Sequence, residues 1–313
     1  MAGAAVQSAA PSATAAAAAA LRSADYLLFS CGAGMSADAS LPLFASRRSY
    51  DRLASPDTLA RDPAAFYGFW LEAREQYLAA APHAGYAAVC RWLRRQQGRR
   101  HASAFCLTSN VDGLLLRAGW PDGLVAQVHG SAVGEWQCGG ELNLAPPHFP
   151  LSTRRRCGAP LFAPALRGCA VERRTGRAVA AEAGWPRCEA CGGIARPNVY
   201  LFGDGEMFQE EERVTRRAAY REWVEGVTAD LRAHPELRLV VVEVGCGLRV
   251  PSVRKRGEEL CAAVPPGQAC LVRINPEHGH SSMVYKPDIV ISTGALDALL
   301  AIEQLLEVEE DDV

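Results

Sequence analysis

The chain has 313 residues, a formal net charge of -2 at pH 7 and eleven cysteines. This length is enough to bury a full core, as one large domain or as a domain that carries a smaller insert. The nearly neutral charge gives no electrostatic reason to expect nucleic acid or an anionic membrane surface as a direct partner. No apolar stretch reaches the roughly 20 residues of a membrane span.

The cysteines and the first residues bear on where the protein works. Most cysteines lie inside apolar runs, where a reduced thiol packs as a small hydrophobic side chain. This pattern predicts a reducing intracellular compartment, the cytoplasm or the nucleus, rather than a disulfide framework. Residues 1–14 are predicted to be a disordered alanine-rich leader, with a helix beginning near Ala15. An organelle-targeting peptide is the alternative, although Arg22 is the only base before the first strand.

Apolar runs alternate with helical patterns over most of the chain, which predicts an α/β fold with a parallel sheet. The predicted strands are 26–30, 104–108, 124–128, 239–244, 270–274 and 288–292. The predicted helices are 63–81, 84–97, 209–234 and 295–307, followed by an acidic tail at 308–313. The segment 138–191 breaks the alternation with prolines, arginines and five cysteines, so it is predicted to be an inserted, loop-rich module rather than sheet.

A glycine-rich loop follows the first predicted strand. It reads Cys31-Gly32-Ala33-Gly34-Met35-Ser36, and its small residues let the backbone approach a ligand closely. With a helix starting near Ser36, the backbone N–H groups of this loop would point at a pyrophosphate. An ordinary tight turn is the alternative interpretation.

Polar side chains follow the next two strands. Asn110 and Asp112 come after the second strand, and His129 comes after the third. Ligands of open α/β sheets bind beyond the carboxyl ends of the strands, where a histidine can act as a general base. Asn110 and Asp112 could instead be turn formers or helix caps, and His129 could be a structural histidine.

The inserted module holds one clear metal-ligand spacing. Cys188 and Cys191 form a C-x2-C pair, which is half of a tetrahedral zinc site. Cys138 is followed by Gly-Gly-Glu rather than by a second cysteine, so the set is completed from Cys157, Cys169 or His148. A module that folds without metal is the alternative.

In their order, these motifs resemble those of the sirtuins, the NAD-dependent protein deacylases of the silent information regulator family, and especially bacterial-type members with an Ala-Arg-Pro-Asn motif. The resemblance covers nearly all of the chain after the leader. The matching pieces are Gly32-Ala33-Gly34-Met35-Ser36, Thr108-Ser109-Asn110-Val111-Asp112, Val128-His129-Gly130, Cys188-x2-Cys191, Ala195-Arg196-Pro197-Asn198, Phe202-Gly203-Asp204, Gly245-Cys246-Gly247-Leu248-Arg249-Val250-Pro251, Ile274-Asn275-Pro276 and Gly294-Ala295.

The resemblance implies a Rossmann-like domain formed by residues 15–137 and 195–307, with a small zinc-ribbon-like module inserted at 138–194 and NAD in the cleft between them. It implies NAD contacts from Gly32, Ala33, Gly34, Ser36, Phe44, Ser109, Asn110, Asp112, Gly245, Cys246, Asn275 and Ala295. One structural zinc ion would be held by Cys138, Cys157, Cys188 and Cys191.

The resemblance also implies the reaction and its partner. His129, with Asn110, would be catalytic: the acyl-lysine oxygen attacks the ribose carbon as nicotinamide leaves, and His129 activates a ribose hydroxyl. The partner would be an acylated lysine of a protein or peptide, received in extended form along residues 199–203 by β-augmentation. Nothing in the sequence indicates an oligomeric state.

The sequence departs from the family pattern after the glycine loop. Sirtuins usually have Pro-Asp-Phe-Arg there, whereas this chain has Pro42-Leu43-Phe44-Ala45. Losing one charge-assisted contact costs on the order of 1.5 to 3 kcal/mol, unless Arg47 or Arg48 replaces it. Ser109 stands where many members have Gln. Two alternatives therefore stay open: an ADP-ribosyltransferase or NAD glycohydrolase that uses the same site, and a catalytically weak sensor that binds NAD or ADP-ribose.

Overall fold

The computed structural model describes residues 12–41, 50–97, 103–140, 156–163, 166, 168–181 and 184–308. The helices are α1 (Ala13–Ser23), α2 (Tyr50–Leu53), α3 (Pro56–Arg61), α4 (Pro63–Ala79), α5 (Ala84–Gln97), α6 (Leu114–Arg117), α7 (Glu212–Thr215), α8 (Arg217–Ala233), α9 (Ser252–Ala263) and α10 (Ala295–Val308). The strands are β1 (Tyr26–Cys31), β2 (Ser103–Thr108), β3 (Val125–Gln127), β4 (Trp136–Cys138), β5 (Ala170–Glu172), β6 (Arg177–Val179), β7 (Ala195–Pro197), β8 (Leu239–Val244), β9 (Ala269–Ile274) and β10 (Ile289–Ile291).

Six strands form one sheet in the order β10-β9-β8-β1-β2-β3. The pairs β1·β8, β8·β9, β9·β10 and β2·β3 are parallel. All six residues of β1 and of β8 are buried, which is typical of parallel strands covered on both faces. The six strands predicted from the sequence are confirmed, with ends that differ by at most one residue.

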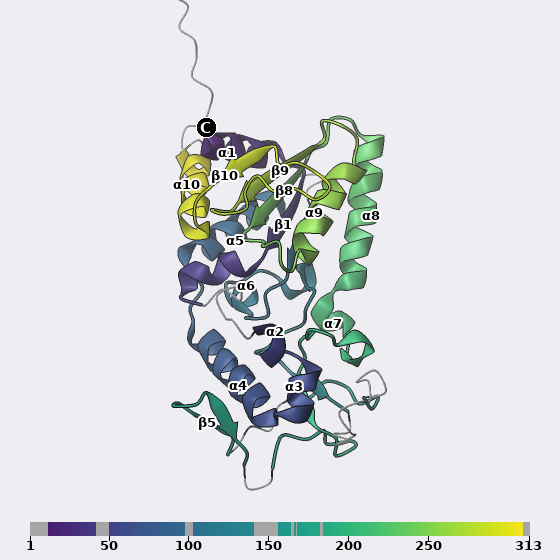
Figure 1. Ribbon diagram of the computed structural model, residues 1–313. Helices are drawn as coiled ribbons and strands as arrows, with labels where there is room; N and C mark the ends of the chain where they lie inside the picture. The colour runs from purple at the N-terminus through teal and green to yellow at the C-terminus, as the bar shows by residue number, and fades with distance from the viewer. Residues whose placement is uncertain are drawn as a thin grey trace, which may run out of the picture. The chain divides into compact units, whose positions relative to one another are not determined.

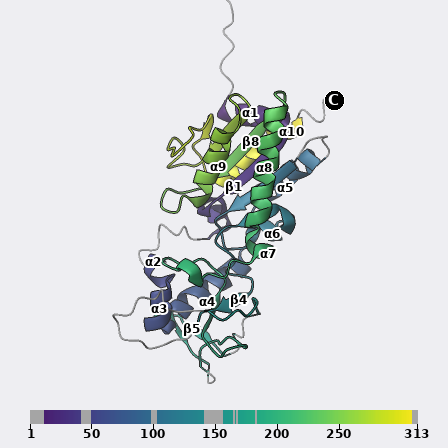
Figure 2. The same ribbon diagram turned by 90° about the vertical axis from the view of Figure 1, so that its right-hand side faces the viewer.

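The described chain divides into two compact units. One consists of Met1–Met35, His83–Phe105 and Trp223–Val313, and the other of Ser36–Pro82 and Cys106–Glu222. In the first unit, α5 and α10 lie on one side of β1, β8 and β9, whereas α9 lies on the other side with α8 beside it (Figures 1 and 2). Because both faces are covered, the functional positions of this unit are the loops at the strand ends.

In the second unit, α4 packs against the β5–β6 hairpin, as Figure 1 shows. The contact is closest at Gly68, where an added Cβ would lie 2.1 Å from the carbonyl oxygen of Gly176. Arg177 fixes the hairpin further, since its Nη1 and Nη2 atoms bind the Asp62 carboxylate at 2.8 and 2.6 Å. The segment 138–191, which was predicted to lack sheet, therefore contains the β5–β6 hairpin, and β4 and β7 pair at its two ends.

Two helix predictions are wrong in part. The predicted helix 209–234 is two helices, because Arg216 between α7 and α8 has a left-handed conformation with φ of 46°. The break is held by tertiary contacts: Arg216 binds Asp122 at 2.6 Å, and the Glu212 carboxylate accepts from the backbone N–H of Ala218 at 2.9 Å. The helix expected from Ser36 is a short 3-10 helix, Ala33–Ala39.

Among the helices of the described ranges, none is long and apolar enough to cross a membrane.

Candidate functional site

The glycine loop after β1 interlocks with the turn after β8. The N–H of Gly32 donates to the carbonyl of Val244 at 3.0 Å, and the N–H of Gly34 donates to the carbonyl of Gly245 at 3.1 Å. An added Cβ on Gly245, whose φ is 62°, would lie 2.4 Å from the Cα of Gly34. A Cβ on Gly32 would lie 2.8 Å from the Gly245 oxygen, so the close approach requires glycine in both turns.

This arrangement corrects one detail of the phosphate-site prediction. The N–H groups of Gly32 and Gly34 donate to backbone carbonyls rather than pointing at a ligand. The two glycines serve first to let the turns meet. Ala33 lies between them and is half-buried.

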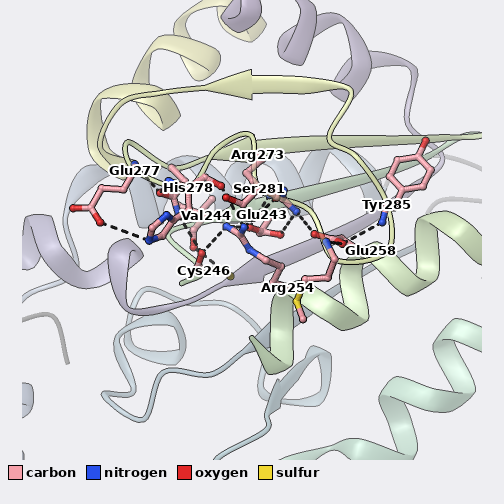
Figure 3. Close-up of polar contacts among 12 residues, drawn as sticks. Glu243, Val244, Cys246, Arg254, Glu258, Arg273, Glu277, His278, Ser281 and Tyr285 are labelled. Atoms are coloured by element: carbon pink, nitrogen blue, oxygen red, sulfur yellow. Dashed lines mark hydrogen bonds and ion pairs between the residues drawn. The ribbon is translucent and has the colours of Figure 1, made fainter. Parts of the chain in front are cut away.

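The turn after β8 is held by polar groups from the same unit (Figure 3). The Cys246 carbonyl accepts from Asn275 Nδ2 at 3.1 Å and from Arg254 Nη2 at 2.7 Å. Asn275 Oδ1 in turn accepts from the backbone N–H groups of Glu277 and His278. Burial raises the pKa of the Cys246 thiol well above its ordinary value, so this thiol is a neutral packing group. Ala295, also buried, is the first residue of α10.

The second unit brings three predicted site residues into one hydrogen-bonded cluster. The Ser36 hydroxyl donates to Asp112 Oδ2 at 2.6 Å, and Asn110 Nδ2 donates to the same hydroxyl at 3.1 Å. Asp112 Oδ1 also accepts from the N–H of Leu114 at 2.9 Å, so Asp112 caps the turn before α6 as well. All three side chains are buried. The half-buried Ser109 lies beside this cluster in the chain, after the last residue of β2.

Burial raises the pKa of the Asp112 carboxyl above its usual range, although the hydrogen bonds from Ser36 and Leu114 oppose the shift. The Ser36 hydroxyl and the backbone N–H of Leu114 both donate to this carboxyl. It can therefore exchange a proton or accept a further donor from a ligand.

His129 lies in the same unit, just after β3, and is half-buried. Its carbonyl accepts from the N–H of Tyr200 at 2.9 Å, and Gly130 pairs with Val199 across an antiparallel bridge. The Tyr200 ring stacks beside the His129 ring, with centroids 6.3 Å apart and planes 21° from parallel. Tyr200 is 44% exposed, so its ring covers one side of the imidazole and still contacts solvent.

The stretch 199–203 was predicted to offer its backbone to an extended peptide. The N–H groups of residues 199 to 202 all donate within the chain, to Pro197, His129, Asp204 and Ala54. An extended peptide at this stretch would therefore depend on its carbonyl groups and not on these four donors.

The four cysteines predicted as metal ligands converge. The sulfur atoms of Cys138, Cys157, Cys188 and Cys191 all lie within 4.8 Å of one another, and the pairs 138–191 and 157–188 are 3.6 Å apart. Four thiolates around zinc at about 2.3 Å place neighbouring sulfurs about 3.8 Å apart, so this donor set fits a structural zinc ion. The N–H of Ala159 is the main cause that lowers the pKa of Cys157 to about 7, which favours the thiolate ligand.

The fourth cysteine of this cluster, which the cysteine spacing left open, is Cys157. Cys169 lies outside the cluster, and His148 lies outside the described residues. Phe44, Leu43, Ala45, Arg47 and Arg48 also lie outside the described residues.

Sequence reasoning missed two features. One is Tyr200 beside His129. The other is a buried network of charged side chains below the Cys246 turn, Glu243, Arg254, Glu258 and Arg273. A signal for the network was present, because Glu243 and Arg273 interrupt apolar strands at positions directly opposite each other.

Comparisons with known proteins agree with this geometry. A family model described as the Sir2 family matches residues 32–224. NAD-dependent protein deacylase 2 of Pseudomonas aeruginosa PAO1 is 32% identical over 223 residues, which span 68% of this chain and 72% of the relative. Mitochondrial NAD-dependent protein deacylase sirtuin-5 of Canis lupus familiaris is 31% identical over 194 residues, which span 58% of this chain and 57% of the relative.

Solved structures show the same fold. A Sir2 homologue in complex with NAD is 18% identical, with a TM-score of 0.58, and the match covers 94% of each chain. A mutant Sir2 homologue in complex with ADP-ribose gives the same identity and TM-score and is covered over 97% of its chain.

Proposed function

Because the chain belongs to the Sir2 family, we propose that it is an NAD-dependent protein-lysine deacylase. The observation that carries this proposal is the buried hydrogen-bonded cluster of Ser36, Asn110 and Asp112. The proposed substrates are NAD, water and an acylated lysine of a protein or peptide, and the products are free lysine, nicotinamide and an acylated ADP-ribose. When bound, NAD supplies a ribose carbon whose bond to nicotinamide breaks.

His129 is the proposed general base. Imidazole is the side chain that exchanges protons near neutral pH, and His129 is accessible enough to meet a substrate hydroxyl. By taking the proton of a ribose hydroxyl, it makes that oxygen a nucleophile toward the acyl carbon. The carbonyl of His129 accepts from the N–H of Tyr200, which fixes the main chain from which the imidazole projects.

The cluster around Ser36 supplies fixed dipoles for the other half of the chemistry. The reacting ribose carbon gains positive charge as nicotinamide leaves, and nearby carboxylate and amide oxygens stabilise such charge. Asn110 and Asp112 are already oriented by hydrogen bonds to Ser36, so little reorganisation is needed when charge develops. Burial of the cluster also limits the access of water.

The zinc site has a structural role in this proposal. Zinc on Cys138, Cys157, Cys188 and Cys191 would join the end of β4 to two loops of the module. A closed set of four thiolates offers no open coordination position, so no step of the reaction is assigned to the metal.

The glycine loop, with Gly245, Cys246, Asn275 and Ala295, is proposed to bind the adenosine and pyrophosphate half of NAD. The loop ends β1 and the Cys246 turn ends β8, which is where ligands of parallel α/β sheets bind. We also propose a reducing compartment, because most of the cysteines are buried, where a reduced thiol packs as a small hydrophobic side chain.

The test is nicotinamide release from NAD by the purified full chain, with and without an acetyl-lysine peptide. The proposal expects release that needs the peptide and that falls at least a hundredfold in His129→Ala, in line with the roughly 10²–10⁴-fold typical of general base catalysis. His234→Ala is the matched control, because His234 is an exposed histidine beside Glu236.

Other outcomes separate the alternatives. Release without peptide would identify an NAD glycohydrolase or ADP-ribosyltransferase. Binding of ADP-ribose without turnover, for acetyl and for longer or acidic acyl groups, would identify a sensor. The relatives described above are named NAD-dependent protein deacylases, so neither alternative is proposed.

A further inference from the structure

Four charged side chains are buried together in the first unit, beside the turn after β8 (Figure 3). Glu243 comes from β8, Arg254 and Glu258 come from α9, and Arg273 comes from β9. Glu243 Oε1 lies 3.0 Å from Arg254 Nη2 and 2.9 Å from Arg273 Nε, and Glu258 Oε1 lies 2.7 Å from Arg273 Nη2. No side chain of the four is more than 1% exposed. Two cations thus balance two anions.

Such a cluster contributes little net free energy to folding. Removing charges from water costs several kcal/mol per ion, and packed apolar side chains of similar volume often stabilise a core as well or better. Stability alone therefore does not explain this buried network, and its hydrogen bonds to neighbouring segments indicate a further role.

The remaining hydrogen bonds go to backbone groups of two segments. One is the Cys246 turn, whose carbonyl accepts from Arg254 Nη2 at 2.7 Å. The other is the loop of residues 277–285, which follows the Asn275 turn. Arg254 Nη1 donates to the carbonyls of His278 and Ser281, each at 3.2 Å, and Arg273 Nη1 also donates to Ser281.

Glu258 completes the attachment of the 277–285 loop. Its Oε2 atom accepts from three consecutive backbone N–H groups, those of Met283, Val284 and Tyr285, at 2.7, 2.6 and 3.1 Å. Met283 and Val284 are 50% and 51% exposed, so apolar burial does not hold this part of the loop. Its position depends on the charged network beneath it.

Arg254 is the member that joins the network to the glycine turns. Cys246 follows Gly245, and the Gly245 carbonyl accepts from the N–H of Gly34 at 3.1 Å. The added-Cβ distance of 2.4 Å between Gly245 and Gly34 leaves these two turns no room to move independently. A displacement of the Cys246 carbonyl is therefore transmitted to the loop after β1.

We propose that Arg254 is a positioning residue for the dinucleotide: it fixes the Cys246 turn against the glycine loop and couples both to the 277–285 loop. The inference rests on the proposed function, because it assumes that the glycine loop binds the ADP-ribose part of NAD. Arg254 acts through the Cys246 carbonyl, and no contact with the dinucleotide is assigned to it.

The test compares Arg254→Lys with Arg273→Lys in the full chain. Both variants keep a buried charge and lose the planar fork that binds several acceptors at once. Of the two arginines, only Arg254 donates to the Cys246 carbonyl, because the hydrogen bonds of Arg273 go to Glu243, Glu258 and Ser281. The measurement is the Kd for ADP-ribose by calorimetry, at a temperature where circular dichroism shows both variants folded.

We expect Arg254→Lys to weaken ADP-ribose binding about tenfold, which corresponds to about one charge-assisted hydrogen bond. Arg273→Lys should change the Kd less than about twofold, whatever its effect on Tm, because it leaves the hydrogen bond from Arg254 to the Cys246 carbonyl in place. Equal weakening in the two variants, or an unchanged Kd in Arg254→Lys, overturns the inference. In that case wild-type binding and turnover still support the deacylase. A wild-type chain that binds no ADP-ribose overturns the proposed function together with this inference.

A second measurement uses the unaltered protein and does not depend on a variant that folds. ADP-ribose should slow amide hydrogen exchange at residues 245–247 and also at residues 283–285, whose N–H groups Glu258 binds. Slower exchange at the glycine turns, with no change at residues 283–285, would overturn the coupling.

Discussion

The hydroxyl of Ser36 donates a 2.6 Å hydrogen bond to the carboxylate of Asp112, inside a cluster that solvent scarcely reaches. Two backbone segments far apart in the sequence are thereby joined through one polar contact. Because burial raises the pKa of Asp112 and Ser36 opposes that shift, this contact also sets the charge of the cluster.

The first prediction concerns pH. A raised pKa means that the folded chain holds a proton on Asp112 at pH values where the unfolded chain, with a carboxyl pKa of about 3.9, has lost it. The contribution of Asp112 to stability is therefore fully present below about pH 4 and is lost as pH rises through the raised pKa. Asp112→Asn should remove this loss. Urea unfolding at pH 4 to 7 measures this effect: the free energy of unfolding of Asp112→Asn, relative to that of the wild type, should increase with pH.

Ser36→Ala is the matched variant for that experiment. Without the hydroxyl donor, the Asp112 carboxylate loses a stabilising partner, so its pKa rises further. The pH-dependent loss of stability should therefore occur at higher pH in Ser36→Ala than in the wild type. A difference between Asp112→Asn and wild type that stays constant from pH 4 to 7 would contradict the raised pKa.

The second prediction concerns zinc. Elemental analysis should find about one zinc per chain in the wild type and well below one in Cys191→Ser, because a tetrahedral structural site needs all four ligands. Chelation should lower the Tm of the wild type, since metal binding contributes to folding. Cys169→Ser is the control and should keep its zinc. Equal zinc content in the two variants would show that Cys191 is not a ligand.

The third prediction concerns Tyr200. Removing the ring in Tyr200→Ala should lower kcat/KM for nicotinamide release roughly three- to tenfold, because an aromatic pair contributes about 0.5–1.5 kcal/mol beyond its buried area. Tyr200→Phe should stay close to wild type, since the ring stacks and the backbone N–H makes the hydrogen bond to His129. If the Phe variant is as impaired as the Ala variant, the hydroxyl and not the ring is the important group.

The fourth prediction concerns Glu303 on α10. Its carboxylate accepts from Arg91, from Trp92 Nε1 at 2.6 Å and from Arg95 Nη1 at 2.8 Å. Burial raises the pKa of Glu303, but the hydrogen bonds from Arg95, Arg91 and Trp92 outweigh burial and leave it below its usual value. The resulting stability is present above the unfolded pKa and is lost as pH falls through the lowered pKa.

Glu303→Gln should therefore reduce the free energy of unfolding by about 1.5–3 kcal/mol at pH 7, the range for hydrogen bonds to charged groups. The deficit should shrink below about pH 4, where the unfolded carboxyl is protonated. Glu307→Gln is the control: this exposed residue lies 3.8 Å from Arg91, and such surface pairs contribute about 0–1 kcal/mol. Urea unfolding at pH 3 to 7 measures both variants.

Local patterns predicted the elements well where an apolar run or a helical periodicity is clear. Val240 to Val242 in β8 form a β-branched run that is buried on both faces, and α5 has the bounds expected from its periodicity. The C-x2-C pair predicted two members of the four-cysteine cluster, Cys188 and Cys191. Its fourth member required the fold, because the cysteine spacing alone does not distinguish Cys157 from Cys169.

Contacts between distant segments account for the errors. No local signal places a left-handed residue at Arg216, whose conformation is supported by Asp122. The N–H groups of Gly32 and Gly34 donate to β8 and to the turn after it, which lie more than half the chain away in sequence. Likewise, Glu243 and Arg273 look like faults in two apolar strands until the register sets them side by side.

The approach of helix α4 to the β5–β6 hairpin has a consequence for protein engineering. Glycine inside a helix usually costs about 1 kcal/mol relative to alanine, so a routine stabilisation scheme would replace Gly68. Here the methyl group of alanine would clash with the Gly176 oxygen, and the β5–β6 hairpin would have to move away from α4. The helix and the hairpin therefore form one transplantable piece, and a chimera that takes α4 from another protein needs that protein's hairpin as well.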